Sequence, residues 1–189
     1  MRWRGRCAVM CGRQAGSGIR RQSATIRRMG DLIADLYRQN EWANLKLLQV
    51  CRGLTDTQMD TAAIGSYRSI RQTLAHFLNS ETYYVRRLGG DYAGPEIPEG
   101  GPWPGFDALE AAVRASAAGL LGRARAAQAA AVAEPAGGEP DNEVVLVQAL
   151  NHSTEHRGQV CTIMSGLRLE PPDLSGWAWA EADGRIPPG

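Results

Sequence analysis

The last long helical segment of the sequence carries the feature that most constrains the fold, a stripe of apolar residues interrupted by two histidines. Residues three or four apart lie on one face of an α-helix, so the stripe predicts an amphipathic helix with this face turned inward. His152 and His156 occupy the middle of that face. The full stripe reads Val145, Ala149, His152, His156, Val160, Ile163 and Leu167.

Two imidazole rings on an inward face need polar partners, because burying an unpaired polar group is costly. Imidazoles four residues apart on a helix can bind one metal ion, and hydrogen bonds to ordinary neighbours are the other solution. The spacing of His152 and His156 leaves both open. The only other histidine, His76, lies in a second strongly helical stretch. From a neighbouring helix it can complete a three-histidine site that leaves coordination positions open for water or substrate.

Four helical segments separated by turn-rich stretches predict an all-α protein. Ser69 and Gln72 match a capping box at the start of the second segment, and Gly89 marks its end. No strand-like alternation of any length occurs. The pattern predicts an antiparallel four-helix bundle, a fold that builds metal sites from inward side chains on facing helices. The expected segments are residues 30–52, 69–88, 107–133 and 141–167.

The first 28 residues differ in composition from the rest of the chain. They contain eight Arg and no Asp or Glu; since the whole chain has 21 Lys and Arg against 20 Asp and Glu, the remainder carries a net charge of −7. Such a segment is typical of an organelle transit peptide or a nucleic-acid-binding arm. Its lack of periodicity favours a disordered tail, or translation starting at Met29 or Met10. We therefore expect a domain at 29–189 after a disordered basic extension at 1–28.

Composition also indicates which binding partners and which cellular compartment to expect. The net charge of +1 suggests neither a nucleic-acid nor a membrane partner, and no apolar run approaches transmembrane length. The four cysteines include no Cys-x-x-Cys pair, so Cys51 and Cys161 are expected as small buried residues and not as disulfide partners. These observations predict a cytoplasmic protein.

Three further residues are candidates to accept hydrogen bonds from metal-ligating rings, whose second N–H needs a partner. Asn40 and Asn44 lie four apart in the apolar stripe of the first helix, facing either the polar pocket of the histidines or the solvated edge. Glu155 stands beside His156, and solvation or pairing with Arg157 or another neighbour is the alternative for it. Arg157 is expected to point outward.

Motifs in three of the helical segments match one known family. They are Asn-Glu-Trp-Ala-Asn-Leu-Lys-Leu-Leu in the first, Ser-Ile-Arg-Gln-Thr-Leu-Ala-His-Phe in the second and Asn-His-Ser-Thr-Glu-His-Arg-Gly-Gln-Val in the fourth, with a later Leu-Glu-Pro-Pro-Asp turn. Over roughly residues 29–179 the chain resembles the DinB/YfiT-like superfamily of four-helix-bundle proteins. The resemblance implies that a divalent metal ion, zinc or nickel, binds the family's three histidines, here His76, His152 and His156.

The same resemblance suggests an activity. Characterised members of the family include S-transferases and isomerases that use a low-molecular-weight thiol such as mycothiol, bacillithiol or glutathione. Metal coordination deprotonates a thiol, and the thiolate is the nucleophile. We therefore expect thiol-dependent transfer or isomerisation on a small electrophilic substrate, in a homodimer. A non-catalytic, stress-associated protein that binds a metal or ligand is the alternative.

Three departures from the family pattern and one rival motif accompany this reading. The departures are the extension before residue 29, the long Pro/Gly-rich segment 89–105 and the brief connection between the third and fourth segments. Segment 89–105 is expected to cover the substrate. His-Ser-Thr-Glu-His also matches the inverted zinc-peptidase motif, with Glu155 as the base. That motif needs a distant downstream Glu as third ligand, and the short tail offers only Glu170 and Glu181, which disfavours a peptidase.

Overall fold

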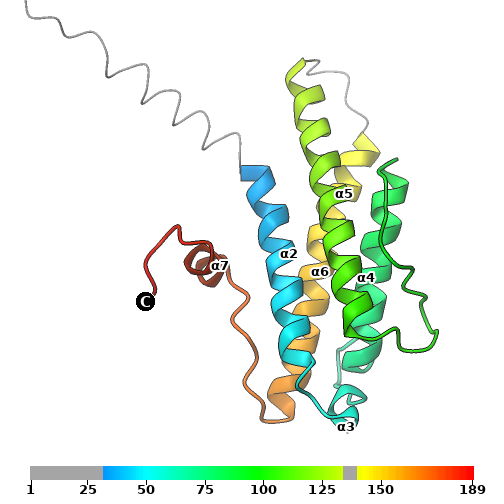
Figure 1. Cartoon of the computed structure of the whole chain (residues 1–189), viewed down its shortest axis with the longest axis vertical. Helices are drawn as coiled ribbons and strands as arrows, with labels where there is room; N and C mark the ends of the chain where they lie inside the picture. Colours follow the sequence, from blue (N-terminus) through cyan, green and yellow to red (C-terminus); the bar gives the residue numbers. More distant parts are fainter. Residues whose placement is uncertain (1–31, 134–139) are drawn as a thin grey trace, which may run out of the picture. The chain divides into compact units, whose positions relative to one another are not determined.

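A computed structural model describes residues 32–133 and 140–189, and these residues form four long helices, two short ones and no strand (Figure 1). The predicted all-α four-helix bundle is confirmed, whereas the predictions for residues 1–28 lie outside the described part of the chain. The helices are α2 (Leu32–Cys51), α3 (Asp56–Met59), α4 (Ile70–Arg87), α5 (Phe106–Ala133), α6 (Pro140–Gly166) and α7 (Gly176–Ala182).

Local sequence explains where α4 begins and ends. The Ser69 hydroxyl accepts a hydrogen bond from the backbone N–H of Gln72, which makes Ser69 the predicted N-cap. The Gln72 side chain accepts from the Ser69 hydroxyl instead of completing the predicted box, and the complete capping box lies in α3. Beyond α4, Gly89 adopts a left-handed φ of 66°, a conformation that suits glycine after a helix.

Contacts between α4 and α5 fix the directions of the helices. Glu81 accepts a hydrogen bond from Ser116, and a Cβ at Gly119 would lie only 2.6 Å from Val85, so both helices advance in the same direction. The long segment 88–105 allows this, because it returns along the bundle before α5 starts (Figure 1). The other consecutive pairs of long helices, α2 with α4 and α5 with α6, run antiparallel (Figure 1).

The core is apolar and drawn from all four long helices. Large side chains such as Leu47, Phe77, Leu109 and Ile163 are almost completely buried. On α2 the inward residues include Ala34, Tyr37, Leu48 and Cys51, whereas Leu36 is 49% exposed. Cys51 and Cys161 are free thiols.

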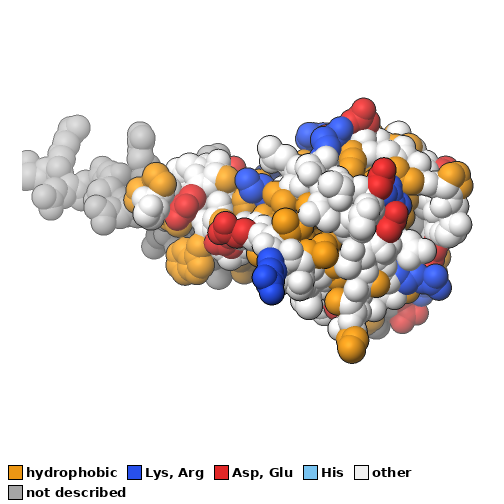
Figure 2. Space-filling model, turned by 90° about the horizontal axis from the view of Figure 1, so that it is seen from below, with side chains coloured by type: hydrophobic (Ala, Val, Ile, Leu, Met, Phe, Trp, Pro, Cys, Tyr) orange, Lys and Arg blue, Asp and Glu red, His pale blue; other side chains and the backbone are white. Residues whose placement is uncertain are grey.

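The surface of the described residues carries mixed charge. Figure 2 views the bundle from the end that carries α3, where basic and acidic side chains lie next to one another among apolar ones. Some charges are paired between elements: Arg71 on α4 contacts both Asp56 and Asp60, and Arg52 contacts Asp107. Among the described helices, none combines the length and the apolar character needed to cross a membrane.

Candidate metal centre

The bundle brings the three histidines together. His76 comes from α4, and His152 and His156 come from α6. Their ring centroids lie 4.4 to 5.2 Å apart, and one nitrogen from each ring falls within 4.8 Å of the others. Of the histidine, cysteine and acidic groups in the described ranges, this set has an arrangement that could hold a metal ion. The sequence predicted these same three residues.

The two α6 rings point at each other. His152 Nε2 lies 3.1 Å from His156 Nε2. Two nitrogens bound to one tetrahedral Zn²⁺ at about 2.0–2.1 Å would lie about 3.3 Å apart. The helix alone therefore places two donor atoms at nearly the separation that a shared ion requires.

Hydrogen bonds at the far side of the His156 ring determine which nitrogen carries its proton. The side-chain oxygen of Gln159 lies 2.9 Å from His156 Nδ1 and also accepts the backbone N–H of Tyr67 at 2.8 Å. Since a backbone amide can only donate, the oxygen of Gln159 must face both groups, and Nδ1 must be the protonated nitrogen. The lone pair of neutral His156 is then on Nε2, the atom facing His152.

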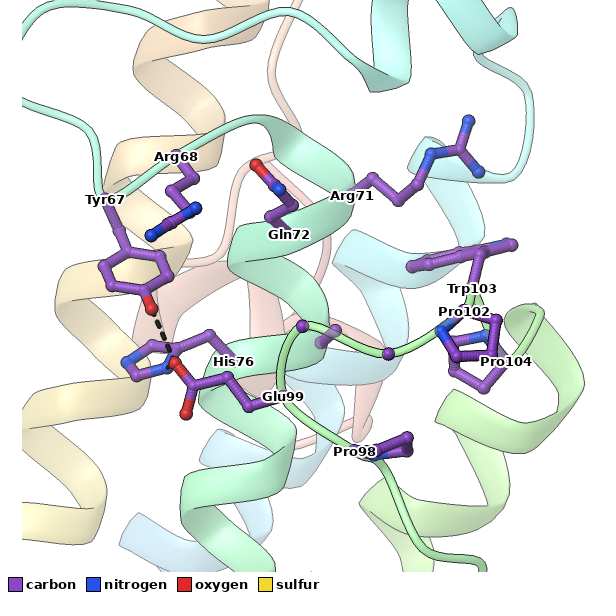
Figure 3. Close-up of a pocket in the computed structure, with 13 residues that line it drawn as sticks. Tyr67, Arg68, Arg71, Gln72, His76, Pro98, Glu99, Pro102, Trp103 and Pro104 are labelled. Atoms are coloured by element: carbon purple, nitrogen blue, oxygen red, sulfur yellow. Dashed lines mark hydrogen bonds and ion pairs between the residues drawn. The ribbon is translucent and has the colours of Figure 1, made fainter.

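His76 is held in the same way by a residue outside the helices. Its Nδ1 lies 2.9 Å from Glu99 Oε1, so Nδ1–H donates to the carboxylate and leaves Nε2 with the lone pair. The hydroxyl of Tyr67 donates to the same oxygen at 2.5 Å (Figure 3). The Tyr67 ring also stacks on His76, with centroids 4.0 Å apart and planes 18° from parallel. Tyr67 therefore donates a hydrogen bond both to Glu99, the acceptor for His76, and to Gln159, the acceptor for His156.

Burial keeps the two α6 histidines neutral at physiological pH. Burial, followed by the neighbouring His156 and His76 rings, lowers the pKa of His152 to about 4. The pKa of His156 is lowered as well, first by burial, against the opposing effect of its bond to Gln159. Neutral imidazole is the form that binds metal ions. The Nδ1 atom of His152, moreover, is buried with no hydrogen-bond partner among the described residues, so the cluster does not satisfy itself.

Asn40 and Asn44 belong to a different buried cluster, centred on Glu81. The side-chain N–H groups of both asparagines donate to Glu81 Oε1 at 2.9 Å. Ser116 and Ser153 donate to the same carboxylate at 2.7 and 2.6 Å. The predicted hydrogen bonds from the histidine rings to Asn40 and Asn44 are therefore not formed, because the side chains of both asparagines are bonded to Glu81 instead.

Arg157 completes this Glu81 cluster, and the expectation that it points outward is wrong. It is only 5% exposed, and its guanidinium donates to the oxygens of Asn40 and Asn44 at 2.6 Å and to Thr154 at 2.9 Å. The two asparagines thus bridge a buried cation and a buried anion, because each amide accepts on one side and donates on the other. Burial lowers the pKa of Arg157 to about 10, against the opposing pull of Glu81.

Glu155 lies outside the ring contacts. It is exposed, and its carboxylate accepts a long hydrogen bond of 3.4 Å from the side-chain N–H of Gln159. Its hydrogen-bond connection to His156 therefore runs through Gln159. Sequence reasoning missed Gln159, although its spacing of three from His156 and seven from His152 places it on the same helical face. No spacing rule points to Tyr67 or Glu99, which lie in connecting segments.

The donor set fits a divalent metal ion. Three imidazoles converge, and two of them have Nδ1–H donors fixed by oxygen acceptors. Such outer hydrogen bonds orient ligating histidines in metal sites. Three nitrogen ligands are the set that zinc sites with an open position use. His76 rather than a C-terminal glutamate stands beside the α6 pair, which removes the basis for the peptidase reading.

Comparison with known proteins agrees with this arrangement. No curated protein proved similar enough to the chain to count as a match. A scan against protein families, however, matches residues 29–183 to the DinB family. The match spans most of the sequence, contains all three histidines and agrees with the resemblance seen in the helical motifs. The chain belongs to the DinB family.

Proposed function

We propose that this DinB-family protein binds one zinc or nickel ion through His76, His152 and His156. The observation that carries the proposal is the orientation of the rings. Glu99 and Gln159 hold the Nδ1–H of His76 and His156, which leaves their Nε2 lone pairs available as ligands. Three imidazoles leave open positions for a further ligand.

We further propose that the site catalyses thiol-dependent S-transfer or isomerisation on a small electrophile. A bound divalent ion would supply the acidity that converts the thiol of a low-molecular-weight cofactor to a thiolate. The chain itself would orient and shield the site: Tyr67 covers one face of His76, and Tyr84 lies edge-on to His152. The external thiol fits the chain, because Cys51 is wholly buried in the core and burial raises the pKa of Cys161.

Metal content measured on protein purified without an affinity tag tests the first step. Wild type is expected to carry about one zinc or nickel per chain, as a three-histidine site would, and His156→Ala none. Gln148→Ala, an exposed position on the same helix, is the matched control and should keep the metal. A folded wild type that contains no metal and takes up neither Zn²⁺ nor Ni²⁺ would remove the proposal.

Cobalt substitution tests the second step. Addition of glutathione or another low-molecular-weight thiol to the Co²⁺-loaded protein should change its visible absorption, because sulfur would enter an open coordination position. Transfer to an electrophile should then depend on both thiol and metal. A loaded protein whose spectrum ignores thiols, and which is inert toward electrophiles, would instead support the non-catalytic alternative.

The homodimer follows from the family resemblance and the cytoplasmic location from the composition of the chain, and both stay predictions. Sedimentation equilibrium of the full chain, with and without metal, measures the first directly. A mass of two chains supports the homodimer, and a mass of one chain removes it.

A further inference from the structure

A small cavity lies beside the histidine cluster, on the outward side of α4. It has a volume of about 210 Å³ and is enclosed between α4 and the Pro/Gly-rich segment 98–104 (Figure 3). His76 and Glu99 form part of its wall. Pockets for drug-sized ligands run to roughly 300–1,000 Å³, so this one suits a smaller molecule, about the size of one ring.

One wall of the cavity is apolar and fixed. It is made by Trp103 and the three neighbouring prolines, Pro98, Pro102 and Pro104. The guanidinium of Arg71 lies over the Trp103 ring, 5.1 Å from its centroid. Arg71 is in turn anchored by Asp60 at 2.7 Å and Asp56 at 2.8 Å, so its charge is already compensated. This wall therefore offers a flat apolar surface and no unpaired charge.

The opposite end carries a cation that has no ion-pair partner. In Figure 3, Arg68 extends beside Tyr67 at the end of the cavity nearest His76. Its guanidinium lies 5.6 Å from the Tyr67 centroid and forms no ion pair with the described carboxylates. Its charge does act on Glu99, whose pKa is lowered first by the hydrogen bond from Tyr67 and also by Arg68. Glu99 is the only carboxylate that lines the cavity, and one of its oxygens is committed to Tyr67 and His76.

We propose that this cavity binds a small carboxylate with a flat or short apolar body, the carboxylate paired with Arg68 and the body packed against Trp103. Guanidinium and carboxylate form paired, charge-assisted hydrogen bonds, and an aromatic wall together with one cation outside an ion pair selects such a ligand over a neutral one. The assignment of this ligand as the electrophilic substrate rests on the proposed function. A ligand beside His76 is close to a reacting group only if the three histidines hold a catalytic metal ion.

Benzoate and its neutral analogue benzamide test the assignment on the full chain. Benzoate is expected to bind with a Kd on the order of 1 mM and benzamide at least about tenfold more weakly. Titration followed by ¹H–¹⁵N NMR locates the ligand, because the indole N–H signal of Trp103, assigned with Trp103→Phe, should shift on binding. Arg68→Met should weaken benzoate binding roughly tenfold or more. Arg87→Met, an exposed arginine of α4, is the control and should not.

The outcomes separate this inference from the proposed function. Benzoate that fails to bind both the metal-free and the metal-loaded protein, or that binds no better than benzamide, overturns the inference even when the metal is present. Benzoate binding to a chain that takes up no metal would support the cavity assignment while the proposed function falls. Unchanged metal content in Arg68→Met, together with weakened benzoate binding, is the result that supports both.

Discussion

Two polar clusters lie inside the same bundle and share α4 and α6, yet they differ in how completely they are bonded. On α6, His152 and His156 face one cluster, while Ser153 and Arg157, the next residue in each case, face the other. In the Glu81 cluster the carboxylate accepts four hydrogen bonds and the asparagines connect it to Arg157. In the histidine cluster a buried ring nitrogen has no partner.

This difference indicates what each cluster is for. A fully bonded buried network is satisfied by the protein alone, and it fixes which helices meet and in which register. A cluster with an orphaned buried atom and converging ring nitrogens is incomplete without something else. We therefore expect the Glu81 cluster to determine stability and the histidine cluster to determine binding, and the following predictions separate the two.

Removal of Glu81 should have the largest effect. Glu81→Ala leaves Arg157 without its nearby counter-charge and removes the acceptor of four donors, of which Ser116 keeps the Val113 carbonyl, so the free energy of unfolding should fall by about 3–5 kcal/mol. Urea unfolding of metal-free protein, followed by circular dichroism, measures it. Glu96→Ala removes an exposed carboxylate paired with Arg86 and should leave stability nearly unchanged. A Glu81→Ala loss no greater than that of this control would refute the structural role.

The sequence indicated the histidine cluster better than the Glu81 cluster for a physical reason. Two histidines at i and i+4 within one stripe must share a neighbourhood, so His152 and His156 could be placed together from spacing alone. The sequence left Asn40 and Asn44 open between the pocket of the histidines and the solvated edge, because helical periodicity does not say which neighbouring helix a residue meets. Arg157 was placed outward because charged residues are seldom buried unless paired, and its partners come from another helix.

The fold was also predictable in part. Caps and periodicity located α2, α4, α5 and α6 to within a few residues, because these signals are local. The parallel direction of α4 and α5 was not predicted, since it depends on the path of segment 88–105, which contains turn residues and no periodic pattern. The same limit explains why Glu99, carried by that segment, was missed although it contacts His76.

Metal binding should produce the next largest change in stability. At a free Zn²⁺ concentration of about 100 times Kd, a site present only in the folded protein stabilises it by about 2.7 kcal/mol. Urea unfolding in a zinc buffer should show this gain in wild type and in Gln148→Ala, but not in His76→Ala. An equal gain in His76→Ala would place the metal elsewhere.

Loss of the Gln159 side-chain oxygen should weaken metal binding without removing it. Gln159→Leu deprives His156 Nδ1–H of its acceptor, and loss of such a bond typically costs 10–100-fold in metal affinity, so we expect a Kd about tenfold higher. Gln159→Glu retains an acceptor and should bind nearly as well as wild type, which separates hydrogen bonding from packing. Competition with a chromogenic chelator gives both affinities. Similar losses in the two variants would mean that shape, not the acceptor, matters.

Acid should destabilise the metal-free protein through the histidine cluster. The pKa of His152 is about 4 in the folded chain against about 6.5 when unfolded, because burial and then the neighbouring rings disfavour its charged form. The unfolded chain therefore binds more protons between these two pH values. The stability that the folded chain gains by keeping His152 neutral is lost as the pH falls from about 6.5 toward 4.

The Glu81 cluster cannot mimic this slope through Arg157, whose lowered pKa of about 10 lies far above the window. His152→Gln removes the titrating group while the surface carboxylates titrate equally in both proteins. Urea unfolding of the chelator-treated proteins between about pH 7 and pH 5 should therefore show a flatter pH dependence in His152→Gln than in wild type. Equal slopes would mean that the His152 ring is no harder to protonate when folded, and that the histidine cluster is as well satisfied as its neighbour.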